Sequence, residues 1–96
     1  MKNSDYIKME FPSKSVNESY ARASVASFAA RLDPTLEELA DIKTAVSEAV
    51  TNCIVHAYPD ELGIIWLRAR IVKDSTLEIM IRDSGVGIED VKKASA

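Results

Sequence analysis

The chain has 96 residues, of which 47% are hydrophobic and 28% charged, a composition typical of one small domain with a packed core. Its net charge of −3 provides no general attraction to nucleic acids or acidic membranes, so we expect neither as a direct partner. The single cysteine, Cys53, excludes an internal disulfide, and the longest wholly apolar run, Ile64–Leu67, is too short to span a membrane. Without a signal-peptide pattern at the N-terminus, we expect a cytoplasmic domain.

The first third of the sequence predicts a strand followed by a helix. Residues 6–11 alternate polar and apolar side chains, which is typical of a half-buried strand, and Pro12 ends the pattern. Ser15 and Glu18 have the spacing of a capping box, so we predict that a helix begins there. Pro34 ends this helix because its ring disfavours a helical conformation in the preceding residue.

A second helix is predicted over residues 35–57. Thr35 and Glu38 form another capping box, and Pro59 follows the end of the helix. Apolar residues recur behind this cap at helical spacing, and they are Leu39, Ile42, Val46, Ala49, Val50, Cys53 and Ala57. One face of a long amphipathic helix therefore packs against the core, with Cys53 among the buried residues.

The remainder of the chain predicts a hairpin and the start of a further helix. Residues 64–72 and 77–82 alternate apolar and polar side chains on either side of a polar turn at 73–75, which indicates two antiparallel strands. A helix is expected to begin after Ile88. The predicted fold is a single α+β domain over residues 1–96, a two-layer sandwich with its helices on one face of a mixed or antiparallel sheet.

Three polar residues follow one another at four-residue spacing on the second helix. Glu48, Asn52 and His56 lie beside the apolar stripe, so that they face either solvent or a pocket. An amide oxygen suits Mg²⁺, which takes few protein ligands, and a carboxylate one turn earlier suits a general base. The spacing alone leaves open that the row is simply the polar face of a surface helix.

A second group of candidate residues follows the last predicted strand. Asp83 ends that strand, where its carboxylate can accept a hydrogen bond from the amino group of a purine. Gly85 and Gly87 permit a close approach of the backbone to a ligand. The segment lacks the features of a P-loop and of a dinucleotide fingerprint, and taken alone it also fits an ordinary turn.

Two basic positions have less specific interpretations. Arg22 lies on the polar side of the first helix, where it is either solvated or in contact with a partner. Trp66, with Arg68 and Arg70, has the composition of a nucleic-acid stacking surface, but one aromatic residue in a net acidic chain is a weak signal for it.

The order of the motifs resembles that of the Bergerat ATP-binding fold, found in gyrase B, Hsp90, MutL and sensor histidine kinases. Residues 48–58 resemble its N-box and residues 83–88 its first glycine box. Residues 17–22, 32–35 and 42–52 are similar to the corresponding segments of the sporulation anti-sigma F factors. The resemblance extends over residues 7–91, almost the whole chain.

This resemblance implies a role for each candidate residue. In the family pattern Asn52 coordinates the Mg²⁺ that bridges the ATP phosphates, and Glu48 is the catalytic base that activates a serine hydroxyl. Asp83 binds the adenine amino group, while Gly85 and Gly87 shape the backbone beside ATP or ADP. Metal-bridged phosphates and a positioned carboxylate are the usual requirements of phosphoryl transfer.

The resemblance also implies partners. Members of the family are dimeric, cytoplasmic serine kinases that inhibit a sporulation sigma factor and phosphorylate an anti-anti-sigma protein, and Arg22 matches an arginine that contacts partners. They continue for some forty residues beyond the match, with an ATP lid and a second glycine box, and have glycine where this chain has Ala57. Two alternatives follow: a non-catalytic sigma-binding module without the lid, and a general-stress anti-sigma kinase of the same superfamily.

Overall fold

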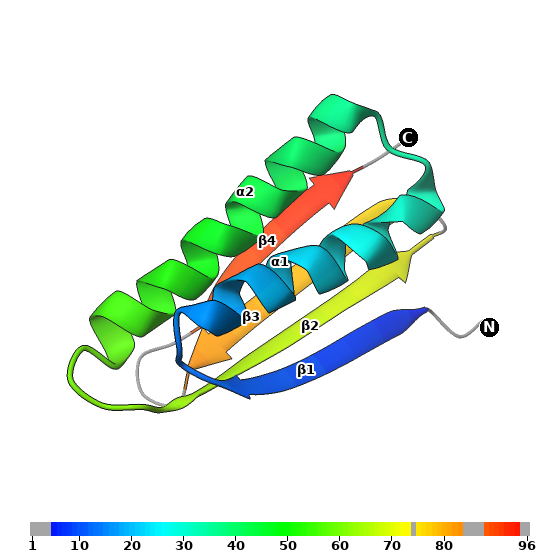
Figure 1. Cartoon of the computed structure of the whole chain (residues 1–96). Helices are drawn as coiled ribbons and strands as arrows, with labels where there is room; N and C mark the ends of the chain where they lie inside the picture. The colour runs from blue at the N-terminus through cyan, green and yellow to red at the C-terminus, as the bar shows by residue number, and fades with distance from the viewer. Residues whose placement is uncertain (1–4, 74, 84–87, 95–96) are drawn as a thin grey trace.

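The computed structural model describes residues 5–73, 75–83 and 88–94. The elements in chain order are β1 (Tyr6–Pro12), α1 (Val16–Ala29), the 3₁₀ turn η1 (Ala30–Leu32), α2 (Leu36–Asn52), the π turn η2 (Cys53–Ala57), β2 (Ile64–Val72), β3 (Thr76–Asp83) and β4 (Ile88–Ala94) (Figure 1). None of the helices in the described ranges is long and apolar enough to cross a membrane.

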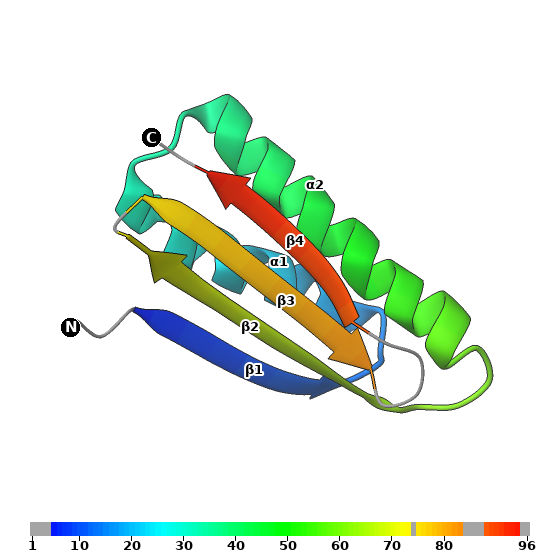
Figure 2. The same ribbon diagram turned by 180° about the vertical axis from the view of Figure 1, so that it is seen from behind.

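The four strands form one antiparallel sheet in the order β1-β2-β3-β4. Both helices cover the same face of the sheet, as the two opposite views show (Figures 1 and 2). This arrangement confirms the predicted α+β two-layer sandwich, and the pairing among the described strands is antiparallel throughout.

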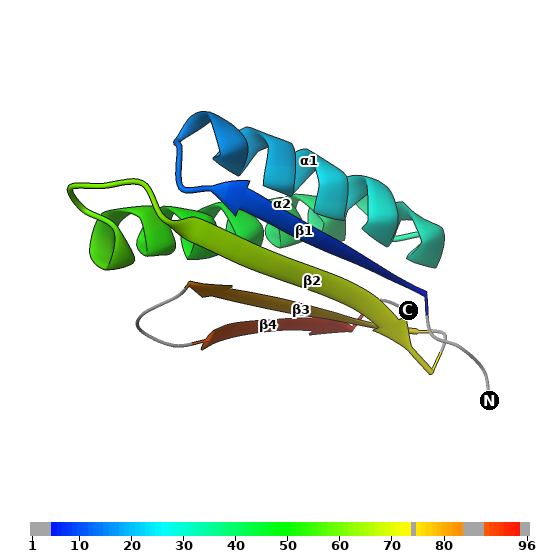
Figure 3. The same cartoon turned by 90° about the horizontal axis from the view of Figure 1, so that it is seen from below.

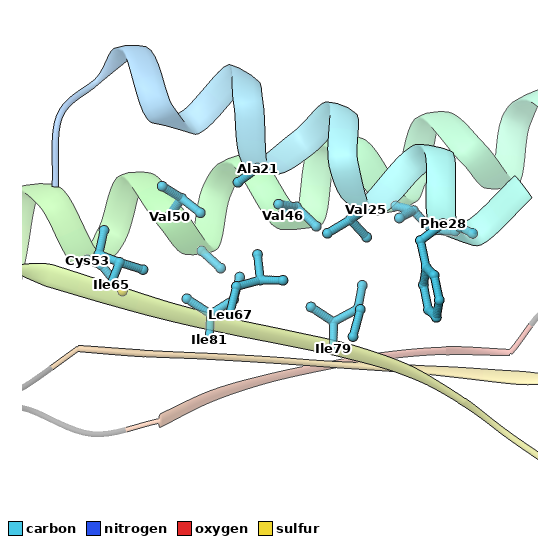
Figure 4. Close-up of a cluster of buried hydrophobic side chains, with 14 of the residues drawn as sticks. Ala21, Val25, Phe28, Val46, Val50, Cys53, Ile65, Leu67, Ile79 and Ile81 are labelled. Carbon is cyan, nitrogen blue, oxygen red and sulfur yellow. The ribbon is translucent and has the colours of Figure 1, made fainter. Parts of the chain in front are cut away.

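The core lies between the helices and the inner face of the sheet. Every second residue of β2 and β3 is buried, as the alternating pattern predicted. These side chains point toward the apolar faces of α1 and α2, and the residues labelled in Figure 4 are Ala21, Val25, Phe28, Val46, Val50, Cys53, Ile65, Leu67, Ile79 and Ile81. Cys53 is buried among them, as predicted.

One of the two predicted capping boxes is confirmed and the other is wrong. At α2 the Thr35 hydroxyl accepts from the Glu38 N–H at 3.0 Å, while the Glu38 carboxylate accepts from the Thr35 N–H at 2.9 Å. Ser15 makes no side-chain cap because its backbone is already helical, with φ −54° and ψ −35°. The Glu18 carboxylate instead pairs with Arg22.

The predicted helix after Ile88 is also wrong. Residues 88–94 form β4, which pairs antiparallel with β3 along its whole length. The unpaired N–H and C=O groups on the edge of β3 provide a complete set of backbone partners for this segment. Pairing with that edge determines the conformation of the segment.

Candidate nucleotide-binding site

A groove of about 410 Å³ lies on the exposed side of the last turns of α2. Its described lining consists of Ser47, Glu48, Thr51 and Asn52. Glu48 and Asn52 are both exposed and one helical turn apart, about 6 Å along the axis, so their carboxylate and amide face the same space. The structure thus brings together two of the three residues of the predicted polar row.

His56, the third residue of that row, does not line this groove. The helix widens to a π turn over Cys53–Ala57, and a π turn takes more residues per revolution than an α-helix. His56 lies within this π turn and is exposed. Ideal α-helical spacing from the sequence did not anticipate this change.

Asp83 lies at the same end of the molecule. It follows Ile79 and Ile81 at even steps along β3, so it is on the face of the sheet that the helices cover. β3 contacts η2, and the two views show the C-terminal ends of α2 and β3 at the same end of the molecule (Figures 1 and 2). Asp83 is half-buried at the end of this strand.

The donor set at this end of the molecule fits a metal-bound nucleotide. The amide of Asn52 is an exposed oxygen donor of the type that Mg²⁺ takes, and Mg²⁺ keeps several waters rather than requiring a protein cage. Within the described ranges no three His, Cys, Asp or Glu side chains are grouped as a metal site. Gly85 and Gly87, predicted to approach the nucleotide, lie outside the described residues.

Arg22 of α1 reaches the groove from the neighbouring helix. Its Nη1 donates to Glu18 Oε2 at 2.8 Å and to Ser47 Oγ at 3.2 Å, and Ser47 is a groove residue. The sequence predicted neither contact, although the four-residue spacing of Glu18 and Arg22 is a signal for the ion pair. The bond to Ser47 has no signal in the sequence because it depends on how α1 packs against α2.

Comparison with known proteins identifies the family. The profile of the family described as "Histidine kinase-like ATPase domain" matches residues 11–96. The chain belongs to this family. The description of this family implies nucleotide binding, and the fold expected from the Bergerat resemblance is confirmed.

Several curated relatives share the sequence closely. The chain is 60% identical over 94 residues to the anti-sigma F factor of Caldanaerobacter subterraneus subsp. tengcongensis. This alignment covers 98% of the chain and 65% of the relative. Identity to the anti-sigma F factor of Thermoanaerobacter sp. (strain X514) is 54% with the same coverage. Identity to the anti-sigma F factor of Clostridium novyi is 56% over 89 residues, and the alignment covers 92% of this chain and 62% of the relative. The chain thus spans just under two thirds of these relatives, and the resemblance to anti-sigma F factors is confirmed.

Proposed function

We propose that this chain is the ATP-binding part of an anti-sigma factor that is also a protein-serine kinase. The observation that carries the proposal is the grouping of Glu48 and Asn52 in one groove, next to the strand end that bears Asp83, in a histidine kinase-like ATPase domain. The relatives named anti-sigma F factor support a sigma factor as the inhibited partner, which we propose to be a sporulation sigma factor.

Each site residue has a distinct task in this proposal. Asp83 accepts a hydrogen bond from the adenine amino group, and its half-buried position strengthens that bond by excluding water. Asn52 provides an amide oxygen to Mg²⁺, which when bound neutralises charge on the ATP phosphates. Gly85 and Gly87 allow the backbone to approach the nucleotide.

Glu48 is the proposed catalytic base. Its carboxylate is exposed in the groove, so it can reach a hydroxyl that enters from solvent. It accepts the proton of the attacking serine of an anti-anti-sigma protein while the serine oxygen bonds to the γ-phosphorus and ADP leaves. Arg22, beside the same groove, contacts the protein partners; we further propose that the chain acts as a cytoplasmic homodimer.

Calorimetric titration of the chain with ATP and ADP, with and without Mg²⁺, tests the nucleotide site. We expect binding that Mg²⁺ strengthens, that N52A weakens mainly in the presence of Mg²⁺, and that D83N weakens about tenfold or more under both conditions. D41N is the matched control, since Asp41 is exposed on α2 outside the groove. Absence of binding by the folded chain, or equal binding by D83N, contradicts the assignment.

A second experiment separates the kinase from the alternative, a sigma-binding module without catalysis. E48Q should bind ATP as the wild type does but transfer no phosphate to the anti-anti-sigma protein, measured with radiolabelled ATP. Transfer by E48Q at the wild-type rate would refute Glu48 as the base. Capture of the sigma factor that does not depend on nucleotide or Mg²⁺, together with no transfer by the wild-type chain, would favour the alternative.

A further inference from the structure

β1 forms an open edge of the sheet. Among residues 5–73, 75–83 and 88–94 the strand order places it at one end, where it pairs with β2 alone (Figure 1). Figure 3 shows both helices over one face of the sheet, and no described element continues the sheet beyond β1. The backbone N–H and C=O groups on such an edge are available to a further strand.

Alternate residues of β1 direct their backbone groups toward this edge. The Ile71 N–H donates to the Asp5 carbonyl, and the Ser13 N–H donates to the Gly63 carbonyl, each at 2.9 Å. Both bonds connect odd-numbered residues of the first segment to β2 or its flank. Because bonded and non-bonded pairs alternate in an antiparallel ladder, the even-numbered residues between them direct their N–H and C=O groups away from β2. These residues are Tyr6, Lys8, Glu10 and Pro12.

Pro12 marks the end of the ladder that this edge can form. It has no N–H, and its carbonyl accepts from Asn17 Nδ2 at 2.9 Å and from the Lys14 N–H at 2.7 Å. The free N–H groups on the edge therefore belong to residues 6–10 of the strand.

Lys8 and Glu10 bring opposite charges to the middle of the edge. Both are exposed, and neither forms an ion pair within residues 5–73 and 75–83. Lys8 Nζ lies over the ring of Tyr6, 5.8 Å from its centroid, which is a contact without a negative charge. β4 is at the opposite edge of the sheet, three strand spacings or about 14 Å from β1. A strand added at the free edge would lie nearer to both charges than β4 does.

The edge is complementary to itself in one register. A two-fold antiparallel ladder on this edge must join even-numbered residues of both copies, because these carry the free backbone groups. An axis at Met9, the middle residue of β1, places Lys8 of each copy opposite Glu10 of the other. An axis at Lys8 or at Glu10 places two like charges opposite each other, which destabilises a sheet. The complementary register is also the one that overlaps the two strands along their whole length.

We propose that β1 pairs antiparallel with β1 of a second copy about a two-fold axis at Met9. This inference rests on the homodimer proposed above and assigns its interface. Each pair of Lys8 and Glu10 exchanges both of its backbone hydrogen bonds and holds opposite charges side by side. On the face that the helices cover, Ile7 meets Phe11 of the second copy and the two Met9 side chains meet. Ile7 and Met9 are only half-buried in the single chain, so pairing buries apolar surface as well.

The pairing leaves the nucleotide groove accessible. α1 contacts β1, whereas α2 contacts β4 at the other edge of the sheet, and the groove lies on the exposed side of α2. Variants of the edge should therefore bind ATP as the wild type does. Failure of the interface and failure of the nucleotide site are thus distinguishable by separate measurements.

Charge reversal on the full chain tests the register by sedimentation equilibrium. We expect a reversible dimer that K8E and E10K each weaken about tenfold. An equimolar mixture of K8E and E10K should dimerise as the wild type does, because every Glu of one variant then faces a Lys of the other. This rescue depends on contacts between chains and not on effects within one chain. The control K43E, on the exposed side of α2, should leave dimerisation unchanged.

Cysteine crosslinking tests the position of the axis. The two Met9 Cα atoms would be about 4.5 Å apart as a non-bonded pair, within the range of about 4.4–6.8 Å that a disulfide spans. The two Ile7 Cα atoms would be four residues out of register, about 14 Å apart. M9C should therefore form a covalent dimer on mild oxidation. I7C and the wild type, whose Cys53 is buried, should not.

The contrary outcomes separate the dimer from its interface. A wild-type chain that is folded and stays monomeric at every concentration overturns both the homodimer and this assignment. A dimer that neither reversal weakens, or that mixing the two variants does not restore, overturns the register. Crosslinking of I7C as readily as M9C overturns the axis at Met9, while the homodimer itself stands.

Discussion

Substitution of Gly63 by alanine tests how the loop before β2 is held together. A Cβ at this position would overlap the ring of Tyr58, which is buried and whose hydroxyl donates to the Ile64 carbonyl at 2.9 Å. Gly63 also exchanges two hydrogen bonds with Ser13, from Gly63 N–H to the Ser13 hydroxyl and from Ser13 N–H to the Gly63 carbonyl, each 2.9 Å. The loop therefore has no room for a methyl group unless the ring moves.

The expected cost follows from these contacts. Overpacking a filled site costs about 1–3 kcal/mol, and displacing the ring of Tyr58 breaks its bond to Ile64, worth about 1 kcal/mol. G63A should therefore lower the free energy of unfolding by about 2–4 kcal/mol. For a domain of this size that corresponds to a decrease in Tm of about 10–20 °C.

Urea unfolding followed by circular dichroism measures this change. L62A, at an exposed neighbouring position, is the control and should change stability by less than about 0.5 kcal/mol. If the ring causes the effect, G63A should cost little in a Y58A background, since the obstacle is then absent. A G63A protein as stable as the wild type, or an equal cost in both backgrounds, would refute the reasoning.

Three further predictions concern stability, each measured by the same urea titration. T35A should lose about 1 kcal/mol because it removes a complete capping box, whereas S15A should be nearly neutral, and equal losses would contradict the difference between the two helix starts. L77A should lose about 2–5 kcal/mol through a core cavity, while M80A, on the face of the sheet away from the helices, should lose less than about 1.5 kcal/mol; the reverse order would mean that the strand faces are misassigned. S47A should change the free energy of unfolding by less than about 0.5 kcal/mol, because the Ser47 hydroxyl accepts only from the partly exposed guanidinium of Arg22. A loss above about 1 kcal/mol would show that this hydrogen bond between α1 and α2 contributes to stability.

Secondary structure was predictable where local pattern and burial agree. The alternation in β2 and β3 and the helical stripe of α2 were both confirmed, because each repeats over several turns or residue pairs. Ser15 shows the limit of a short motif. Its spacing to Glu18 fits a capping box, but the backbone enters the helix one residue earlier than that motif requires.

The candidate site was predictable in part. Glu48 and Asn52 share a helix turn, so their proximity follows from spacing alone. The place of Asp83 near the end of α2 depends on the direction in which β3 runs under the helices. The π turn that contains His56 has no clear sequence signal. The assigned functions of these residues stay predictions.

The sequence by itself determined the α+β class, the amphipathic faces and the one-turn pairing of Glu48 with Asn52, since these depend on interactions between residues close in the chain. Only the tertiary structure decided that residues 88–94 form a strand and that Arg22 bonds to Ser47. It also decided that Lys8 lies opposite Arg68. Such contacts join residues far apart in sequence, and strand register and helix packing determine them. Register and packing in turn minimise unpaired backbone groups and exposed apolar surface over the whole domain, which no single segment can do alone.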